Sequence, residues 1–438
     1  MGEALDILLI EPHSDLGLLS GGSTIPLWPA ALSAVTPAQH RLDFKHCSYE
    51  KLRSETIRGR DLVGISTRTE TANNAYAIAD RCREMGVPVV MGGVHASMCP
   101  GEAEEHCDAL VVGEAENTWP TVVGDVQENR LASRYRGTPT APEEFPMPDF
   151  PLVRKYKYQV ENVLETVRGC PNVCEFCSAT QFSGKKYRFK PTDQILREIG
   201  EWRRNAWLSV FADLNIGIRK SKAKEVFEAL VPYKLNWMAY ATVDIVNDDE
   251  LLELMSRSGC IYLGLGFESV SDETLQEMNK SKNARLDYKE IIRTLHYYNI
   301  DVFGNFIFGL DTDSEDVFED TVDYALEAGI DFPVYQNLTP YPGTQIHDRL
   351  EESGRLLTND WSRYNRFDAV YEPKQLSPVE LMKGLFWAYE ETYSRKNRLK
   401  RFFQRSRGLK RSLFNEIILR HVSKQFYLMK KHYGYLYG

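Results

Sequence analysis

Short apolar runs and helix-like stretches alternate twice along this chain of 438 residues, and this double alternation limits the folds open to it. In the first stretch the apolar runs stand at 5–12, 41–48, 62–67, 88–93 and 109–114. A strand buried on both faces reads as a continuous apolar run, and strands that alternate with helices form parallel sheets. We therefore predict a doubly wound, Rossmann-like α/β domain over residues 1–135.

The second alternation begins after a stretch rich in proline and acidic residues, which we interpret as a linker over residues 136–158. Strand candidates then follow at 162–169, 207–214, 237–244, 262–269, 302–309 and 332–339. Six strand–helix units predict a partial (β/α)6 barrel of parallel strands over residues 159–370, with its chemistry at the carboxyl ends of the strands. The remaining residues, 371–438, have a helical pattern and form a predicted basic C-terminal domain.

The composition favours a chain that stays in the cytoplasm. No run approaches the roughly 20 apolar residues of a membrane span, and the first residues lack the pattern of a secretory signal. Eight cysteines spread over so long a chain do not suggest a disulfide framework, so we expect reduced thiols that bind metal or are buried.

Three of these cysteines, Cys170, Cys174 and Cys177, stand on one loop directly after the first predicted barrel strand. Three thiolates can hold three irons of a four-iron cluster and leave the fourth iron open for a substrate. The alternatives are a structural zinc site or three unrelated buried cysteines. A structural zinc site usually needs four ligands, and no fourth Cys or His is near in the sequence. The pattern therefore favours an iron–sulfur cluster.

The spacing CxxxCxxC, with an aromatic residue before the last cysteine, resembles the radical S-adenosylmethionine (SAM) superfamily. That resemblance implies a 4Fe-4S cluster on the three cysteines and reductive cleavage of bound SAM to a 5′-deoxyadenosyl radical. It also implies SAM contacts at the loop and at the ends of later strands, which we place at Phe176, Ala212, Asp213, Glu268, Asn305 and Ile307. For Asp213 and Glu268 the alternative is a capping or ion-paired carboxylate. No residue is identified as a catalytic acid or base.

A doubly wound domain followed by this barrel is similar to the cobalamin-binding branch of the superfamily, which includes anaerobic cyclases and hopanoid methylases. Matching segments are 63–66, 92–95, 112–116 and 338–344, together with Asp360 and Trp361. In such sheets ligands bind at the carboxyl ends of the strands, so we expect cobalamin at Ser66, Thr67, Gly92, Gly93, Gly113 and Glu114. The Asp-x-His-x-x-Gly loop by which some corrinoid proteins supply a histidine is absent.

Other residues of the first domain are interpreted without a ligand. His95 follows the Gly92-Gly93 strand end, where a histidine is more often a hydrogen-bonded structural residue than a functional one. Cys47, Cys82, Cys99, Cys107 and Cys260 are interpreted as small buried hydrophobic residues.

The resemblance favours methylation of an unactivated carbon, with hydrogen abstraction by the radical and a methyl group delivered from cobalamin. A second hypothesis is a cobalamin-independent dehydratase, cyclase or mutase that uses the first domain as a scaffold. A third, non-enzymatic hypothesis is a redox-sensing iron–sulfur protein. It would leave the barrel and its strand-end carboxylates without a purpose.

The sequence indicates less about the substrate and the partners than about the cofactors. Tyr335, Asn337 and Tyr341 lie near the end of the last barrel strand and are candidates to line a small-molecule or lipid site. A flavodoxin or ferredoxin would supply electrons. From Arg395 onward the chain has 13 Lys and Arg against one acidic residue, Glu416. Such a tail could contact an anionic membrane, although charge runs are usually solvated. No pattern indicates nucleic-acid binding.

Overall fold

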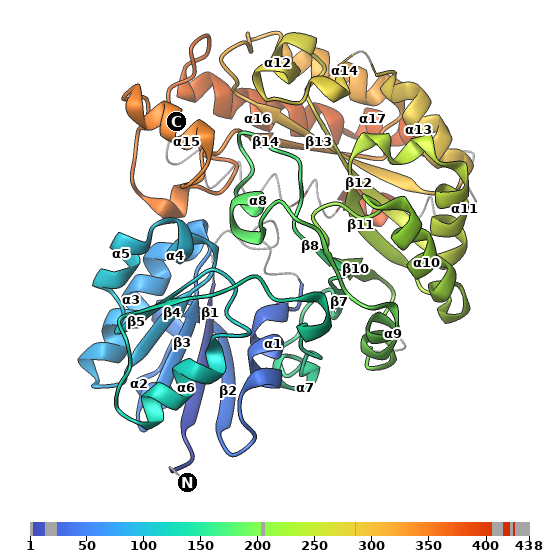
Figure 1. Cartoon of the computed structure of the whole chain (residues 1–438). Helices are drawn as coiled ribbons and strands as arrows, with labels where there is room; N and C mark the ends of the chain where they lie inside the picture. Colours follow the sequence, from blue (N-terminus) through green and yellow to red (C-terminus); the bar gives the residue numbers. More distant parts are fainter. Residues whose placement is uncertain are drawn as a thin grey trace.

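The computed structural model describes residues 3–13, 24–202, 206–284, 286–404, 415–420 and 424. Figure 1 shows an N-terminal α/β domain, a larger curved sheet covered by helices, and C-terminal helices that pack on that second sheet. These are the parts that the two alternations predicted.

The N-terminal sheet has six parallel strands in the order β2-β1-β3-β4-β5-β6. They span Asp6–Pro12 (β1), Arg41–Cys47 (β2), Leu62–Ser66 (β3), Val89–Gly92 (β4), Ala109–Val112 (β5) and Arg134–Arg136 (β6). The chain reverses its direction of winding between β1 and β3, which is where doubly wound sheets bind their ligands. The sequence pattern did not indicate β6, because its three residues include two exposed arginines.

Helices cover both faces of this sheet. They are α1 (Leu27–Val35), α2 (Ser54–Ile57), α3 (Ala72–Glu84), α4 (Val94–Met98), α5 (Pro100–Glu105) and α6 (Trp119–Gln127). Helix α3 buries Ala75, Ile78, Ala79 and Cys82, which recur at helical spacing, against the sheet. One face of the sheet packs around these residues, and the other packs around Trp119 and Phe44.

The segment predicted as a linker is packed rather than extended. It contains the short helix α7 (Phe150–Val153), which lies between the two domains. Phe150 belongs to the core of the second sheet, whereas Val153 belongs to the core of the N-terminal domain. The domains are therefore joined by buried apolar contacts.

The second sheet has six parallel strands in the order β14-β13-β12-β11-β10-β7. They span Asn162–Leu164 (β7), Ser209–Phe211 (β10), Trp237–Ala241 (β11), Cys260–Glu268 (β12), Asp301–Phe308 (β13) and Phe332–Asn337 (β14). Strands β7 and β14 are edges that do not pair with each other, so the barrel is partial, as predicted. The first predicted strand is interrupted: Val167–Arg168 (β8) turns away to pair antiparallel with Arg188–Phe189 (β9).

The barrel helices are α8 (Ser178–Ser183), α9 (Thr192–Gly200), α10 (Lys220–Leu230), α11 (Asp249–Ser258), α12 (Asp272–Glu277), α13 (Tyr288–Tyr297), α14 (Val317–Ala328) and α15 (Gln345–Glu352). Their boundaries follow from local chemistry. The side chain of Asp248 accepts a hydrogen bond from the Leu251 N–H at the start of α11, and Gly259 ends that helix at a φ of +99°.

The C-terminal helices cover the β14 edge of the barrel. The helix α16 (Pro378–Thr392) begins with a capping box between Ser377 and Glu380, and α17 (Arg395–Gln404) follows it. Among the helices that the structure describes, none combines the length and apolar content of a membrane span.

Most of the basic tail lies outside the described residues, including Arg405, Arg407, Lys410 and Arg411. Two tail arginines that are described are engaged within the protein. Arg398 forms an ion pair with Glu416 at 3.3 Å. Arg401 is buried and donates to the carbonyl oxygen of Thr392 at 2.6 Å. Arg401 therefore has no part in a membrane-facing surface.

Candidate active site

The three loop cysteines lie between β8 and α8, at the mouth of the barrel. Gly169 has a φ of +87°, and a Cβ atom there would lie 2.2 Å from the carbonyl oxygen of Lys186. Glycine is therefore required at the entrance of the loop. The N–H of Cys170 donates to the carbonyl oxygen of Gly184 at 3.1 Å, which fixes the loop against the end of α8.

Three thiols on one loop suit a cluster better than a structural zinc ion, which usually takes four protein ligands. Cubane ligands sit on separate irons. Burial raises the pKa of Cys170, and that of Cys174 to about 11, so binding iron must displace protons.

Asp213, which follows β10, holds the chain just before the cluster loop. Its Oδ1 atom accepts hydrogen bonds from the N–H groups of Thr166 at 2.6 Å and Val167 at 3.1 Å. Its other oxygen accepts a hydrogen bond from the Thr166 hydroxyl. The carboxyl is buried, and burial raises its pKa to about 7. These contacts account for Asp213 structurally, and its contact with SAM stays a prediction.

Glu268 ends β12 in a left-handed conformation, with a φ of +69°. Its carboxylate accepts a hydrogen bond from the Nζ of Lys280 at 3.0 Å, and both side chains are largely buried. Burial alone would lower the pKa of Lys280, but the Glu268 carboxylate together with Cys174 and Cys177 outweighs burial and raises that pKa. The neighbouring Asn279 donates to the carbonyl oxygen of Val173 in the cluster loop at 3.0 Å. No motif in the sequence indicated Lys280, a largely buried cation beside the cluster cysteines.

Strand alternation separates the predicted residues of β13 and β14 onto two faces. Along β13, Asn305 and Ile307 are partly exposed, whereas Phe306 and Phe308 belong to the core beneath the helices. The partly exposed residues therefore face the barrel lumen. Asn305 and Ile307 are opposite Val334 and Gln336 of β14, which are also partly exposed.

This alternation corrects the expectation for Tyr335 and Asn337. Both are buried on the helix-covered face of β14, where the Tyr335 hydroxyl lies 2.8 Å from the hydroxyl of Thr392. The side-chain amide of Asn337 donates to the carbonyl oxygen of Phe367 at 2.7 Å. Gln336, which lies between them in the sequence, is the residue of this strand end that faces the lumen.

The remaining predicted residues lie around the barrel mouth. Phe176 is partly buried against the barrel core, and Ala212 is exposed at the end of β10. Tyr341 is partly buried, and burial raises its pKa to about 12. The roles of these residues toward SAM and substrate stay predictions.

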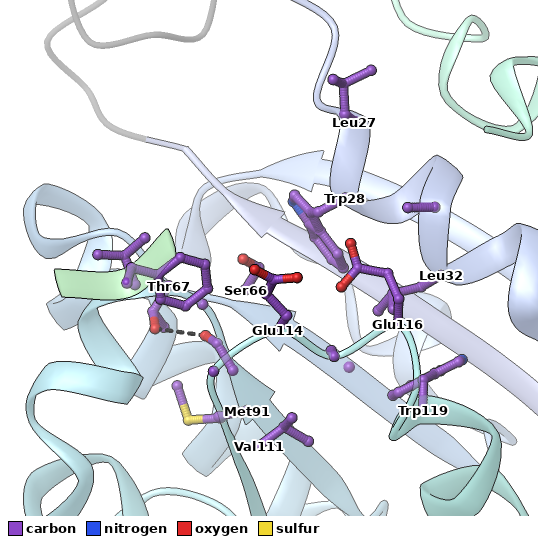
Figure 2. Close-up of a pocket in the computed structure, with 18 of the residues that line it drawn as sticks. Leu27, Trp28, Leu32, Ser66, Thr67, Met91, Val111, Glu114, Glu116 and Trp119 are labelled. Atoms are coloured by element: carbon purple, nitrogen blue, oxygen red, sulfur yellow. Dashed lines mark hydrogen bonds between the residues drawn. The ribbon is translucent and has the colours of Figure 1, made fainter. Parts of the chain in front are cut away.

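All six residues predicted to bind cobalamin line one cavity of about 350 Å³ at the carboxyl ends of β1, β3, β4 and β5. Figure 2 shows Ser66, Thr67 and Glu114 around this cavity. Gly93 has a φ of +95°, and a Cβ atom there would lie 2.6 Å from the backbone nitrogen of Thr67. Gly113 shares the same unusual φ. At these glycines the cavity wall consists of backbone without side chains, which a large flat ligand can approach closely.

Aromatic residues that the sequence analysis missed complete the cavity. Trp28 and Trp119 line it from α1 and α6, and Phe182 lines it from α8 of the barrel (Figure 2 labels the two tryptophans). The indole N–H of Trp28 donates to the carboxylate of Glu11, whose pKa is raised by burial. None of the described lining residues is a histidine, in keeping with the absent histidine loop. The mainly apolar lining, with its backbone at the glycines, suits one face of a corrinoid held without a protein histidine ligand.

The cavity adjoins the cluster loop through a network of buried charges. Glu114, at the end of β5, accepts a hydrogen bond from Arg168 at 3.0 Å and also pairs with Arg188. Arg168 pairs in addition with Glu116 at 2.6 Å and stands two residues before Cys170. Burial raises the pKa of Glu114, but Arg188 and its other partners outweigh burial and lower it. One set of ion pairs therefore joins the cavity wall to both strands that flank the cluster loop.

Two family models match the chain in these regions. The model described as the radical SAM superfamily matches residues 164–325, and the model described as the B12 binding domain matches residues 19–123.

Relatives match over most of the chain. A bacteriochlorophyllide d C-12(1)-methyltransferase of Chlorobaculum tepidum is 31% identical over 88% of this chain and 87% of its own. A bacteriochlorophyllide d C-8(2)-methyltransferase of the same organism is 30% identical over 90% and 91%. The structure of the radical SAM methyltransferase TsrM of Kitasatospora setae, with cobalamin and a [4Fe-4S] cluster bound, has a TM-score of 0.67 at 15% identity, covering 88% of each chain. This last similarity concerns the fold.

The chain belongs to the radical SAM enzymes that carry an N-terminal cobalamin-binding domain. Its cofactors are a 4Fe-4S cluster, SAM and cobalamin. These findings confirm the predicted family and fold class and support radical C-methylation of a small molecule.

Proposed function

We propose that the protein methylates an unactivated carbon of a chlorophyll-type macrocycle. One observation supports radical methylation as the reaction class. The cavity at the strand ends of the first domain is bordered by Arg168, which stands two residues before the first cluster cysteine. A methyl carrier in that cavity and a radical source at the cluster loop would act on the same substrate.

When bound, the cluster and SAM supply a hydrogen-abstracting radical, and cobalamin supplies the methyl group. In the proposal Cys170, Cys174 and Cys177 hold the cluster, while Asn305 and Ile307 face SAM in the lumen. Gly92, Gly93 and Gly113, together with Ser66, Thr67 and Glu114, bind cobalamin. The protein's task is to position the reactants and exclude water.

The macrocycle is proposed because the two relatives above, each matched over about nine-tenths of its length, carry names that specify bacteriochlorophyllide d. The lumen is compatible with such a substrate. Its partly exposed residues include Met238, Tyr240, Phe303 and Ile307, with the Gln336 amide among them. Flat aromatic molecules stack well on side chains of this kind.

A flavodoxin or ferredoxin is the proposed electron donor, and the cytoplasm is the proposed location. Membrane contact is proposed only for the exposed side of the tail, which includes Lys400 and Leu399.

Anaerobic, reconstituted protein tests the proposal with SAM, a reductant, cobalamin and bacteriochlorophyllide d. We expect 5′-deoxyadenosine, S-adenosylhomocysteine and a product that is heavier by one methylene unit. Cys174→Ala should abolish all three, whereas Cys260→Ala, a buried cysteine of β12 away from the loop, should retain them. Deoxyadenosine without S-adenosylhomocysteine would instead support the dehydratase or cyclase hypothesis. Methylation of a hopanoid but not of the macrocycle would refute the substrate class.

A further inference from the structure

We propose that His95, Cys99 and Glu102 form a binding site for a zinc-type divalent metal ion, separate from the iron–sulfur cluster and independent of the proposed function. One ring nitrogen of His95, the Sγ of Cys99 and a carboxylate oxygen of Glu102 lie within 4.8 Å of one another. An ion with bonds of about 2.0–2.3 Å can join three such donors after small side-chain adjustments.

The sequence spacing explains why these residues meet. They occupy positions i, i+4 and i+7, with His95 in α4, Glu102 in α5 and Cys99 at the junction between the two helices. Cys99 itself has non-helical angles, with φ −119° and ψ 59°. Its N–H donates to the carbonyl oxygen of His95 at 2.8 Å and its carbonyl oxygen accepts from the N–H of Ala103 at 3.1 Å, so hydrogen bonds hold the two helices together across the junction. Pro100 then begins α5, where its missing N–H has no cost.

His95 provides an independent indication of a ligand. The residue is 0% exposed, and its Nε2 atom is buried with no hydrogen-bond partner among the described residues. Its Nδ1 atom lies 3.3 Å from the hydroxyl of Thr69, which leaves Nε2 as the free nitrogen. A buried polar atom without a partner calls for a ligand, and a metal ion satisfies it.

The donor set selects the class of metal. A thiolate, an imidazole and a carboxylate together suit Zn²⁺ or Co²⁺, whereas Mg²⁺ and Ca²⁺ prefer oxygen donors alone. Burial raises the pKa of Cys99 to about 12, so binding must release the thiol proton to solvent. Three protein ligands leave a fourth position for water.

The site lies where the barrel segment after α15 meets the first domain, near α4 and α5 in Figure 1. The indole N–H of Trp361 donates to both carboxylate oxygens of Glu102, at 2.8 and 3.1 Å. The same indole packs edge-on against the His95 ring, with 4.9 Å between centroids. Trp361 thus orients Glu102 as outer-shell residues orient metal ligands. An ion here would be held by the first domain, with Trp361 of the segment after α15 orienting one of its ligands.

Two measurements test the site, and neither depends on SAM, cobalamin or substrate. The first is zinc content per chain in the cluster-loaded full-length protein. We expect about one zinc per chain, lost in Cys99→Ser and retained in Cys107→Ser. Cys107 is a matched control because it is a buried cysteine of the same domain outside the trio.

The second measurement is Co²⁺ titration of the full-length chain with Ser at positions 170, 174 and 177, so that cobalt cannot occupy the cluster loop. We expect a thiolate-to-cobalt charge-transfer band that disappears with the added change Cys99→Ser. Glu102→Gln should weaken cobalt binding at least ~10-fold, since it removes one ligand charge. No zinc in the loaded protein, or a cobalt band that survives Cys99→Ser, would refute the site.

Discussion

At the scale of single residues, Asp213 and Glu268 are two buried carboxylates at strand ends with different partners. Glu268 has a cation beside it, Lys280, whereas Asp213 is surrounded by hydrogen-bond donors that are neutral. Neutral donors offset only part of the cost of burying a charge. Burial therefore raises the pKa of Asp213, to about 7.

This raised pKa predicts a pH-dependent stability. Between pH 4 and 7 the folded protein holds the Asp213 proton and the unfolded chain releases it. Asp213 therefore makes stability fall by up to about 1.4 kcal/mol per pH unit as pH rises through this window. Asp213→Asn cannot titrate, and its amide can still accept from both N–H groups and pair with Thr166. We expect the thermal midpoint of the variant, relative to that of wild type, to be higher at pH 8 than at pH 5.

The control for this prediction is Asp193→Asn, which changes an exposed carboxyl on α9. It should follow the wild-type pH dependence. Parallel curves for wild type and Asp213→Asn would show that the buried carboxyl does not titrate in this range.

At the scale of elements, helix α16 supplies hydrogen-bond partners to the open edge of the barrel. Strand β14 has no neighbour on its outer side, so its backbone groups need other partners. The Tyr389 hydroxyl accepts from the Tyr335 N–H at 2.9 Å and donates to the Tyr335 carbonyl oxygen at 2.7 Å. Tyr393 donates to the carbonyl oxygen of Pro333 at 2.7 Å. Two tyrosines of one helix thus replace part of a missing strand.

Tyr389→Phe should therefore destabilise the protein by about 2–4 kcal/mol, because it leaves a buried N–H and a buried carbonyl without this partner. The thermal midpoint, or the denaturant midpoint of the apoprotein, measures the loss. Trp387→Phe on the same helix changes a side chain that is 41% exposed and should cost less than 1 kcal/mol. Equal effects of the two changes would argue against edge capping.

At the scale of the whole molecule, the two halves are joined by buried charges as well as by apolar packing. Glu114 belongs to the first domain, and its partners Arg168 and Arg188 belong to the strands beside the cluster loop. A buried ion pair is costly to break because the remaining partner stays buried with its charge.

We expect Glu114→Gln to lower the stability by about 3–5 kcal/mol and to weaken the retention of cobalamin, since this residue forms part of the cavity wall. Thermal unfolding and bound corrinoid after gel filtration measure the two effects. Glu104→Gln removes a solvent-exposed pair with Arg134 and should leave the stability close to that of wild type. A Glu114 variant as stable as this control would mean that the network does not join the domains.

Local sequence patterns were enough to predict five of the six strands of the first sheet, the strand regions of the second sheet and the cluster loop. Apolar runs mark parallel strands directly, and the spacing of three cysteines within eight residues is a local property. The six predicted cavity residues also met around one cavity, because the carboxyl ends of parallel strands share one edge of a sheet.

The side of β14 that faces the lumen could not be read from the sequence and depends on how the helices pack on the barrel. Helices cover one face of this strand, and a partly apolar lumen lies at the other face. Polar and apolar residues therefore do not alternate clearly along Val334, Tyr335 and Gln336, and the sequence does not show which of them point to the lumen. The aromatic lining of the cavity and the Lys280–Glu268 pair also could not be predicted from the sequence, because the residues that meet there are distant from one another along the chain. Contacts between distant segments depend on packing, and packing is set by the whole fold.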